Sequence, residues 1–471
     1  MNGWNYVHRS MRHGAGAPGL LALALAVSAL SVPWAAAHSS PVQDEKSGLP
    51  IGSELDEDAI VNPREVFHSE AVHGRKSYLS VLGNLAFNSP YSLGEAARKA
   101  HISCASCHVN GASNPKLFIP GMSSRPGNFD TTGALFNPKA DNRVLDPVTI
   151  PSLRGARFLA PYGHDGRTAS LRDFVRNVIV NEFAGSEPSA QILDAIVIYL
   201  EDIDFLPNAG LDAAGRLKSA ASAADRGQTL FAKPFPHDPR LSCAACHVPS
   251  GAFVDHEQHD IGSGGIFKTP TLLNADFNAP YFHDGRFDDY DQVIDHFNRV
   301  FDLGLTVQDH ADLKAYLTAV GDGVRPEYHL TGINVLADID DFAGVFDIAI
   351  SSRDAPVIAL AVKSLSDQLQ DLADHYPDPA GGEISGGARE RTLARATIAA
   401  LRDRLHRLGV AAAHARFDQA AGEYLSYRKL TAAAAPLALQ NAEPWSLFNP
   451  ALHAAHQAVL RQTASDDAAS R

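Results

Sequence analysis

The pentapeptide CASCH spans Cys104 to His108, and CAACH spans Cys243 to His247. Between them they contain all four cysteines of the chain. The spacing C-x-x-C-H is the attachment signature of c-type haem, because two thiols three positions apart form thioethers with its vinyl groups while the adjacent histidine reaches the iron. The sequence therefore predicts two covalently bound c-type haems. Their attachment residues are Cys104, Cys107, Cys243 and Cys246, and their proximal iron ligands are His108 and His247.

Two alternatives remain open for the cysteines. Disulfides are common in exported proteins, and thiols together with histidine also form zinc sites. We favour haem because the two motifs account for every cysteine, in a chain that also carries an export signal.

A longer repeat lies downstream of each pentapeptide. The octapeptides APYGHDGR (residues 160–167) and APYFHDGR (residues 279–286) differ at one position. Over the longer segments 150–167 and 269–286, 11 of 18 positions are identical. The octapeptide is repeated because each copy belongs to one haem-binding unit.

Each octapeptide is followed by two stretches with apolar residues at helical spacing. In the first half these residues are Leu171, Phe174, Val175 and Val178, then Ile192, Ala195, Ile196 and Tyr199. In the second half they are Tyr290, Val293, Ile294 and Phe297, then Leu313, Tyr316, Leu317 and Val320. Each half therefore predicts a helix, the haem motif, a long loop, the octapeptide turn and two further helices.

The expected fold is mostly α, with two cytochrome c-like haem domains in tandem and a C-terminal helical extension. The first haem domain covers residues 60–206 and the second covers residues 225–328. Residues 207–224 are rich in Gly, Ala and Ser and are predicted to link them. The extension, residues 331–471, contains no cysteine. It could cover a haem edge, dimerise, dock a partner or serve only as a structural flank.

The N-terminus reads as a secretory signal peptide over residues 1–37. Arg9 and Arg12 form a positive region, residues 20–32 are apolar, and Ala35–Ala37 offer a cleavage site. The alternative is a membrane anchor, but the apolar run is short for a span of roughly 20 residues. We therefore expect a soluble, periplasmic protein without a stable membrane span.

The charge of the chain restricts its partners. The formal net charge is −14, and loss of two arginines with the signal peptide makes it more negative. Nucleic acid is therefore not expected as a partner, because phosphate binding needs Lys and Arg. An acidic surface suits a basic partner protein.

In these motifs the chain resembles the bacterial diheme cytochrome c peroxidase family, which includes the MauG-type enzymes. The resemblance covers about residues 60–330 and is closest over CAACH and TPTLLNADFNAPYFHDGR (residues 269–286). It implies that hydrogen peroxide is reduced at the first haem, with electrons that enter at the second from a cytochrome c or cupredoxin. It also implies that a glutamate past the first octapeptide moves protons. Glu182 in VIVNEFAG stands there, about two residues earlier than the family pattern.

The sequence departs from the family pattern at the sixth iron ligands. Residues 109–163 contain no histidine, so the first haem is expected to be five-coordinate and open. Met122 is the only methionine outside the signal peptide and is a candidate ligand. At the second haem, Phe297 stands where the family has Met or Tyr. Its neighbour His296 is the candidate there, although a one-residue shift turns a helical side chain by about 100°.

Three further positions also differ or stay open. The family's bridging Trp before the first Asp-Gly is replaced by His164, which we expect to hydrogen-bond a propionate or the backbone, like His283. The family's calcium site uses an Asn where Thr149 stands, so a calcium ion is not firmly predicted. His256 and His259, in a loop after the second haem motif, are weaker candidates for its sixth ligand.

Three functions fit these residues. The first is a diheme peroxidase that reduces hydrogen peroxide to water with electrons from a small redox protein. The second is a MauG-like oxidase that uses peroxide to oxidise a protein or small molecule. The third is a diheme electron carrier without catalysis, and a homodimer is compatible with each.

Overall fold

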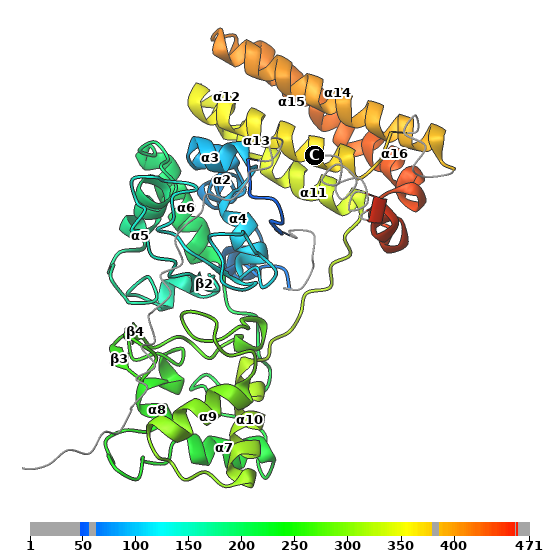
Figure 1. The fold of residues 1–471 in the computed structure, drawn as a ribbon. Coiled ribbons are helices and arrows are strands. Elements are labelled where there is room, and N and C mark those ends of the chain that lie inside the picture. The colour runs from blue at the N-terminus through cyan, green and yellow to red at the C-terminus, as the bar shows by residue number, and fades with distance from the viewer. Residues whose placement is uncertain (1–47, 56–62, 379–385, 457, 460–471) are drawn as a thin grey trace, which may run out of the picture. The chain divides into compact units, whose positions relative to one another are not determined.

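The structure is a computed structural model that describes residues 48–55, 63–378, 386–456 and 458–459 (Figure 1). The predicted signal peptide lies outside these residues. Most secondary structure is helical, and the described strands form two two-stranded antiparallel ribbons. The predicted mostly-α class is confirmed.

The first repeat, residues 63–206, contains short helices around a single core. Its elements are α1 (His68–His73), α2 (Tyr78–Phe87), η1 (Pro90–Ser92), α3 (Glu95–Lys99), α4 (Cys104–Cys107), η2 (Val109–Gly111), β1 (Asn128–Phe129), β2 (Val148–Thr149), η3 (Ala156–Phe158), α5 (Leu171–Asn177), the π-helical turn η4 (Val178–Glu182) and α6 (Ala190–Asp202). The predicted helix after the first octapeptide is present as α5, but it passes into a π turn at Val178.

The second repeat, residues 225–328, follows the same order with fewer elements, since the described residues have no counterpart of α1, η1, α3 or η4 there. Its elements are α7 (Ala223–Phe231), α8 (Cys243–Cys246), η5 (Pro249–Gly251), β3 (Gln258–Asp260), β4 (Ile266–Lys268), η6 (Ala275–Phe277), α9 (Tyr290–Val300) and α10 (Val307–Gly321). Helices α9 and α10 cover the two apolar stretches predicted after the second octapeptide.

In both repeats the first long helix crosses the last one at a glycine. A Cβ atom on Gly83 of α2 would lie 1.9 Å from the Ala195 carbonyl oxygen of α6. A Cβ atom on Gly227 of α7 would lie 2.0 Å from the Asp312 carbonyl oxygen of α10. The helix backbones can approach this closely only because glycine has no side chain.

The C-terminal extension is helical, as predicted. It contains α11 (Gly332–Ala343), α12 (Val345–Ser351), α13 (Ala355–Asp374), α14 (Ala388–Ala413), α15 (Phe417–Lys429), the π turn η8 (Leu430–Ala434), α16 (Ala435–Ala442) and η9 (Glu443–Trp445). Leu82 and Leu85 of α2 belong to the same buried cluster as the interior of the extension. An ion pair of 2.6 Å joins Arg64 to Asp338 of α11. The extension therefore shares a hydrophobic core with the first repeat.

The two repeats also contact each other through their octapeptide turns. The Thr149 amide donates to the His283 carbonyl over 2.7 Å, and the Lys268 amide donates to the His164 carbonyl over 2.9 Å. The Lys268 ammonium donates to the carbonyls of Leu159 and Pro161, each over 2.7 Å. The octapeptide turn of each repeat is thus hydrogen-bonded to a short strand of the other repeat: β2 binds the second turn, and β4 binds the first.

None of the helices in the described ranges combines the length and the apolar character that crossing a bilayer demands.

Candidate functional site

Each C-x-x-C-H motif begins with one turn of helix. The Ser242 hydroxyl accepts the Ala245 amide at the start of α8, and Ser103 forms a capping box at the start of α4. All four thiols are free of disulfides. Burial raises the pKa of the Cys104 and Cys243 thiols to about 12. Each motif thus places two thiols on one helical turn.

Both motif histidines are held in the tautomer that an iron ligand needs. Nδ1 of His108 lies 3.0 Å from the Pro151 carbonyl oxygen. Nδ1 of His247 lies 3.2 Å from the Phe253 carbonyl oxygen, and this histidine is also hydrogen-bonded to the Pro270 carbonyl. A carbonyl only accepts, so Nδ1 carries the proton and Nε2 keeps the lone pair. Burial lowers the pKa of both imidazoles, that of His108 to about 4.

Sequence reasoning missed an aromatic pair beside each histidine. In the first repeat, the Phe87 ring lies 5.2 Å from Tyr199 and 6.3 Å from His108, centroid to centroid. In the second repeat, Phe231 lies 5.0 Å from Tyr316 and 6.2 Å from His247. The signal was present in the sequence: each phenylalanine stands four residues after a helix-crossing glycine, in GNLAF and GQTLF.

A buried arginine in the first repeat has guanidinium atoms without a hydrogen-bond partner among the described residues, and the Glu65 carboxylate is its one nearby charge that raises its pKa. Arg154 is 1% exposed, and its Nη2 donates to the Pro63 carbonyl over 2.6 Å. Its Nε and Nη1 atoms have no hydrogen-bond partner among the described residues. Burying a charge with unpaired hydrogen-bond donors costs free energy. An anion bound at Nε and Nη1 of Arg154 would remove that cost. Haem carries two propionate carboxylates, and the residues of the first repeat therefore fit a bound haem.

Replacement of Arg154 by Leu should lower the reduction potential of the first haem, because a buried positive charge favours the ferrous state. We expect a fall of about 60 mV, the shift that equals a tenfold change in a one-electron equilibrium. The second haem should not change, since Leu273 occupies the equivalent position there. Spectroelectrochemical titration measures both potentials. Arg157→Leu, which removes a partly exposed arginine paired with Asp204, is the control; an equal shift in that variant contradicts the assignment.

Glu182 ends the π turn η4 and its side chain is 12% exposed. Its Oε1 lies 3.2 Å from Nη2 of Arg167, the arginine that closes the first octapeptide. Burial raises the pKa of the Glu182 carboxyl, and the charge and hydrogen bond of Arg167 oppose the rise. A buried carboxyl held beside a fixed cation can accept and return a proton. π turns are frequent at functional sites.

The second repeat has no carboxyl at the corresponding place. Glu182 stands 15 residues after Arg167, and the residue 15 after Arg286 is Phe301. Arg286 is paired with Asp284, as Arg167 is with Asp165, and it has no counterpart of the Glu182 contact in the described residues. A buried carboxyl paired with the octapeptide arginine is therefore present in the first repeat, and the corresponding place in the second repeat holds Phe301.

The two candidate sixth ligands lie in buried surroundings. Met122 is 4% exposed and packs in the core of the first repeat, in contact with Gly133. His296 is 6% exposed, and its Nε2 lies 2.8 Å from the Ile261 carbonyl oxygen. That nitrogen therefore donates a proton to the carbonyl, and only Nδ1 keeps a lone pair. Whether either residue ligates iron stays a prediction.

Phe282, the position at which the octapeptides differ, packs against His296 with ring centroids 4.8 Å apart. Both Gly163 and Phe282 have a positive φ, 89° and 71°. Glycine adopts this conformation easily, whereas a phenylalanine there is strained. The second repeat thus accepts backbone strain to place an aromatic ring beside His296.

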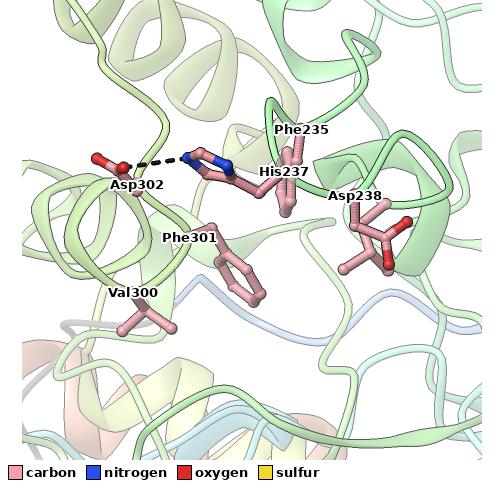
Figure 2. Close-up of a pocket in the computed structure, with 7 residues that line it drawn as sticks. Phe235, His237, Asp238, Val300, Phe301 and Asp302 are labelled. Carbon is pink, nitrogen blue, oxygen red and sulfur yellow. Dashed lines mark hydrogen bonds and ion pairs between the residues drawn. The ribbon is translucent and has the colours of Figure 1, made fainter.

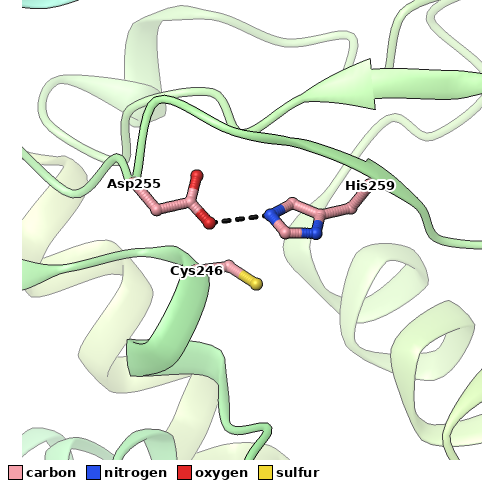
Figure 3. Close-up of side chains that lie close together, drawn as sticks. All are labelled: Cys246, Asp255 and His259. Carbon is pink, nitrogen blue, oxygen red and sulfur yellow. Dashed lines mark hydrogen bonds and ion pairs between the residues drawn. The ribbon is translucent and has the colours of Figure 1, made fainter. Parts of the chain in front are cut away.

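The weaker candidates His256 and His259 have different partners. His256 Nδ1 lies 2.7 Å from the Ala160 carbonyl oxygen, in the first repeat. His259 forms a 2.7 Å ion pair with Asp255, beside the Cys246 sulfur (Figure 3). Cys246, Asp255 and His259 are the one group of three in the described ranges close enough to hold a metal ion. If Cys246 forms a thioether with haem, its sulfur is not available as a thiolate ligand. A zinc ion at this group and a haem attached at Cys246 therefore exclude each other.

The second repeat also has an open pocket of about 210 Å³ (Figure 2). Its lining includes Phe301 and the exposed pair His237–Asp302. The Phe301 ring stacks on Phe297 at 6.0 Å, and Phe297 lies 6.0 Å from Phe282. A series of aromatic rings thus leads from the surface to the second octapeptide.

Comparison with known proteins identifies relatives of this arrangement. Residues 221–316 match the model of the di-haem cytochrome c peroxidase family. Hydrazine synthase subunit gamma of Kuenenia stuttgartiensis is 24% identical over 267 residues, 45% of this chain and 67% of that protein. A solved structure of hydrazine synthase from that organism covers 64% of this chain and 100% of the matched chain, at 21% identity and a TM-score of 0.38.

Two further relatives carry peroxidase or MauG names. Methylamine utilization protein MauG of Methylorubrum extorquens is 24% identical over 265 residues, 46% of this chain and 67% of that protein. Cytochrome c peroxidase Ccp of Escherichia coli is 42% identical over 59 residues, 11% of this chain and 13% of that protein. The second repeat therefore contains a match to the di-haem cytochrome c peroxidase family, and the chain is similar at low identity to MauG.

Proposed function

We propose that the protein is an exported diheme peroxidase that reduces hydrogen peroxide to water. Two haems would be attached at the C-x-x-C-H motifs, with His108 and His247 as proximal ligands. The observation that carries the proposal is the asymmetry between the repeats: Glu182 is a buried carboxyl beside Arg167, and Phe301 stands at the corresponding place.

The roles follow from the residues. Bound haem supplies one-electron chemistry and an iron to which peroxide can bind. Glu182 would accept a proton from one peroxide oxygen and return it to the oxygen that leaves as water. Two electrons and two protons convert one peroxide into two water molecules. Arg167 would hold the carboxylate in place while it is ionised.

The electron donor is proposed to be a small basic protein, a cytochrome c or a cupredoxin. Residues 225–328 contain 16 acidic and 8 basic residues, a net charge of −8, whereas residues 60–206 contain 14 of each. The excess negative charge of the second repeat favours encounter with a positively charged donor there. The rings from Phe301 to Phe282 support electron entry at the same repeat.

The test is peroxide-dependent oxidation of a reduced basic cytochrome c by the purified holoprotein. We expect rapid turnover that weakens as ionic strength rises, because salt screens the attraction between the surfaces. An acidic cytochrome c of similar potential is the matched control and should turn over slowly at every salt concentration. Absence of peroxide-dependent oxidation with both donors would remove the peroxidase assignment.

The similarity to MauG supports a second candidate, an oxidase that uses peroxide on a protein or small-molecule substrate. Slow cytochrome oxidation together with a mass change in a partner protein incubated with enzyme and peroxide would favour it. A homodimer, and a role of the extension in forming it, remain proposals that sedimentation can check.

A further inference from the structure

The first octapeptide turn is held by residues of the second repeat. Five carbonyl oxygens between residues 159 and 165 accept hydrogen bonds from donors between residues 256 and 268. The accepting residues are Leu159, Ala160, Pro161, His164 and Asp165, and the donors are His256, Gln258 and Lys268. The position of this turn therefore depends on the repeat that does not contain it.

Lys268, the last residue of β4, supplies three of these five hydrogen bonds. Its amide donates to the His164 carbonyl over 2.9 Å, and its ammonium donates to the carbonyls of Leu159 and Pro161, each over 2.7 Å. The ammonium also lies 5.8 Å from the centre of the Tyr162 ring, within the range of a cation–π contact. Burial lowers the pKa of Lys268 to about 8 and that of the neighbouring His164 imidazole to about 4. Near neutral pH the first turn therefore contacts an ammonium ion, beside a neutral imidazole.

The residue at the aligned position of the first repeat makes a different contact. Thr149 stands where the second repeat has Lys268. Its hydroxyl donates to the Phe282 carbonyl over 3.0 Å, two positions further along the second turn than the counterpart of Pro161. A threonine side chain is shorter than that of lysine and carries no charge. The ammonium contact thus distinguishes the first turn, in the repeat that also contains Glu182.

The turn joins this contact to Arg167. Two backbone hydrogen bonds close the turn: the Tyr162 amide donates to the Thr168 carbonyl over 2.7 Å, and the Thr168 amide donates to the Tyr162 carbonyl over 3.2 Å. Arg167 stands one residue before Thr168, and its Nη2 lies 3.2 Å from Oε1 of Glu182. The guanidinium therefore reaches Glu182 from a closed turn whose first residues are held by Lys268.

We propose that Lys268 is a positioning residue for proton transfer at Glu182, and that it acts across the repeats by holding the first octapeptide turn and with it Arg167. The proposal rests on the acid–base role proposed above for Glu182. Lys268 does not touch peroxide. Its contribution is to keep the Arg167 guanidinium within hydrogen-bonding distance of the carboxylate, so that the second repeat controls the geometry of the acid–base group in the first.

The pH dependence of peroxide turnover by the holoprotein tests this role. Burial raises the pKa of the Glu182 carboxyl and Arg167 opposes the rise, so displacement of Arg167 should raise that pKa further. The other side chain that contacts the carboxylate, Asn177, is neutral. Glu182 must be ionised to accept the first proton, so kcat/KM falls as the pH drops through its pKa. Lys268→Met should move this acid limb to higher pH and lower turnover on it by up to about 10²-fold, the cost of misplacing a positioned group.

Three further variants separate positioning from loss of the fold. Lys268→Arg keeps a cation with several donors, so its acid limb should return toward that of the wild type. Lys268→Gln keeps one donor group and should shift the acid limb by an intermediate amount, which tests the role even if the methionine variant does not fold. Lys218→Met makes the same chemical change at an exposed lysine that donates to the Ala209 carbonyl over 3.1 Å, and it should behave as the wild type.

A double variant tests whether the effect passes through Arg167. Arg167→Gln removes the cation beside Glu182 and should move the acid limb by itself. Lys268→Met should add little in that background, because residues that act through one shared contact are not additive. An unmoved acid limb in a folded Lys268→Met, or a full additional shift in the double variant, would overturn the proposal.

Hydrogen–deuterium exchange of the holoprotein distinguishes failure of this proposal from failure of the peroxidase assignment. Lys268→Met should speed exchange of the Tyr162 and Thr168 amides several-fold, whereas Lys218→Met should leave it unchanged. Faster exchange without peroxide turnover in the wild type supports the hold of Lys268 on the turn and removes the peroxidase assignment. Unchanged exchange, together with peroxide turnover in the wild type, rejects the role of Lys268 and leaves the peroxidase assignment standing.

Discussion

Glu182→Gln should lower peroxide turnover by about 10²–10⁴-fold, the usual contribution of a positioned acid–base group. Glutamine keeps the size of the side chain and can still contact its neighbours, but it can neither take nor return a proton. Binding of peroxide to the first haem should persist. Steady-state oxidation of a reduced cytochrome c measures turnover, and stopped-flow absorbance of the haem measures the binding step.

The matched control for this variant is Glu187→Gln. Glu187 lies five residues further along, is exposed, and pairs with Arg176 on the surface. It should turn over peroxide like the wild type. Full activity in Glu182→Gln, or an equal loss in both variants, contradicts the role assigned to Glu182.

Gly83→Ala and Gly227→Ala should each destabilise their repeat by about 3 kcal/mol or more, at the upper end of overpacking costs. The new Cβ atoms would lie 1.9 Å and 2.0 Å from a backbone carbonyl oxygen of the crossing helix. A backbone oxygen cannot swing away as a flexible side chain can, so the two helices have to separate. Thermal unfolding followed by far-ultraviolet circular dichroism and by haem absorbance measures the loss.

Gly422→Ala is the control for both glycine variants. Gly422 lies in α15, where an added Cβ meets nothing within 4 Å. Alanine favours a helix interior over glycine by about 0.5–1 kcal/mol, so this variant should be slightly more stable. A gain in stability for Gly83→Ala would show that α2 and α6 do not cross at this residue.

The fold could be predicted from the sequence because its main signals are local. The C-x-x-C-H motifs and the repeated octapeptides located equivalent positions in both halves. Apolar residues at helical spacing then located α6, α9 and α10. The extension also has helical periodicity, and Leu401, Leu405 and Leu408 are fully buried in α14 as that pattern predicts.

The parts that sequence reasoning missed depend on contacts between distant residues. Nothing near Leu82 indicates that it shares a core with the extension, more than 250 residues away. The π turn that ends at Glu182 changes the helical register, which a search at constant 3.6-residue spacing does not detect. The hydrogen bonds of Thr149 and Lys268 are made by backbone atoms, which every residue type has, so the sequence carries no mark of them.

The central claim is that the first haem is open and reacts with peroxide while the second supplies electrons. Electron paramagnetic resonance and optical spectra of the purified holoprotein test it most directly. They are recorded oxidised and half-reduced, each before and after one equivalent of hydrogen peroxide. The account predicts a high-spin ferric signal from the first haem that disappears when peroxide is added. Two low-spin signals that ignore peroxide, even after half-reduction, would contradict it and identify the protein as a diheme electron carrier.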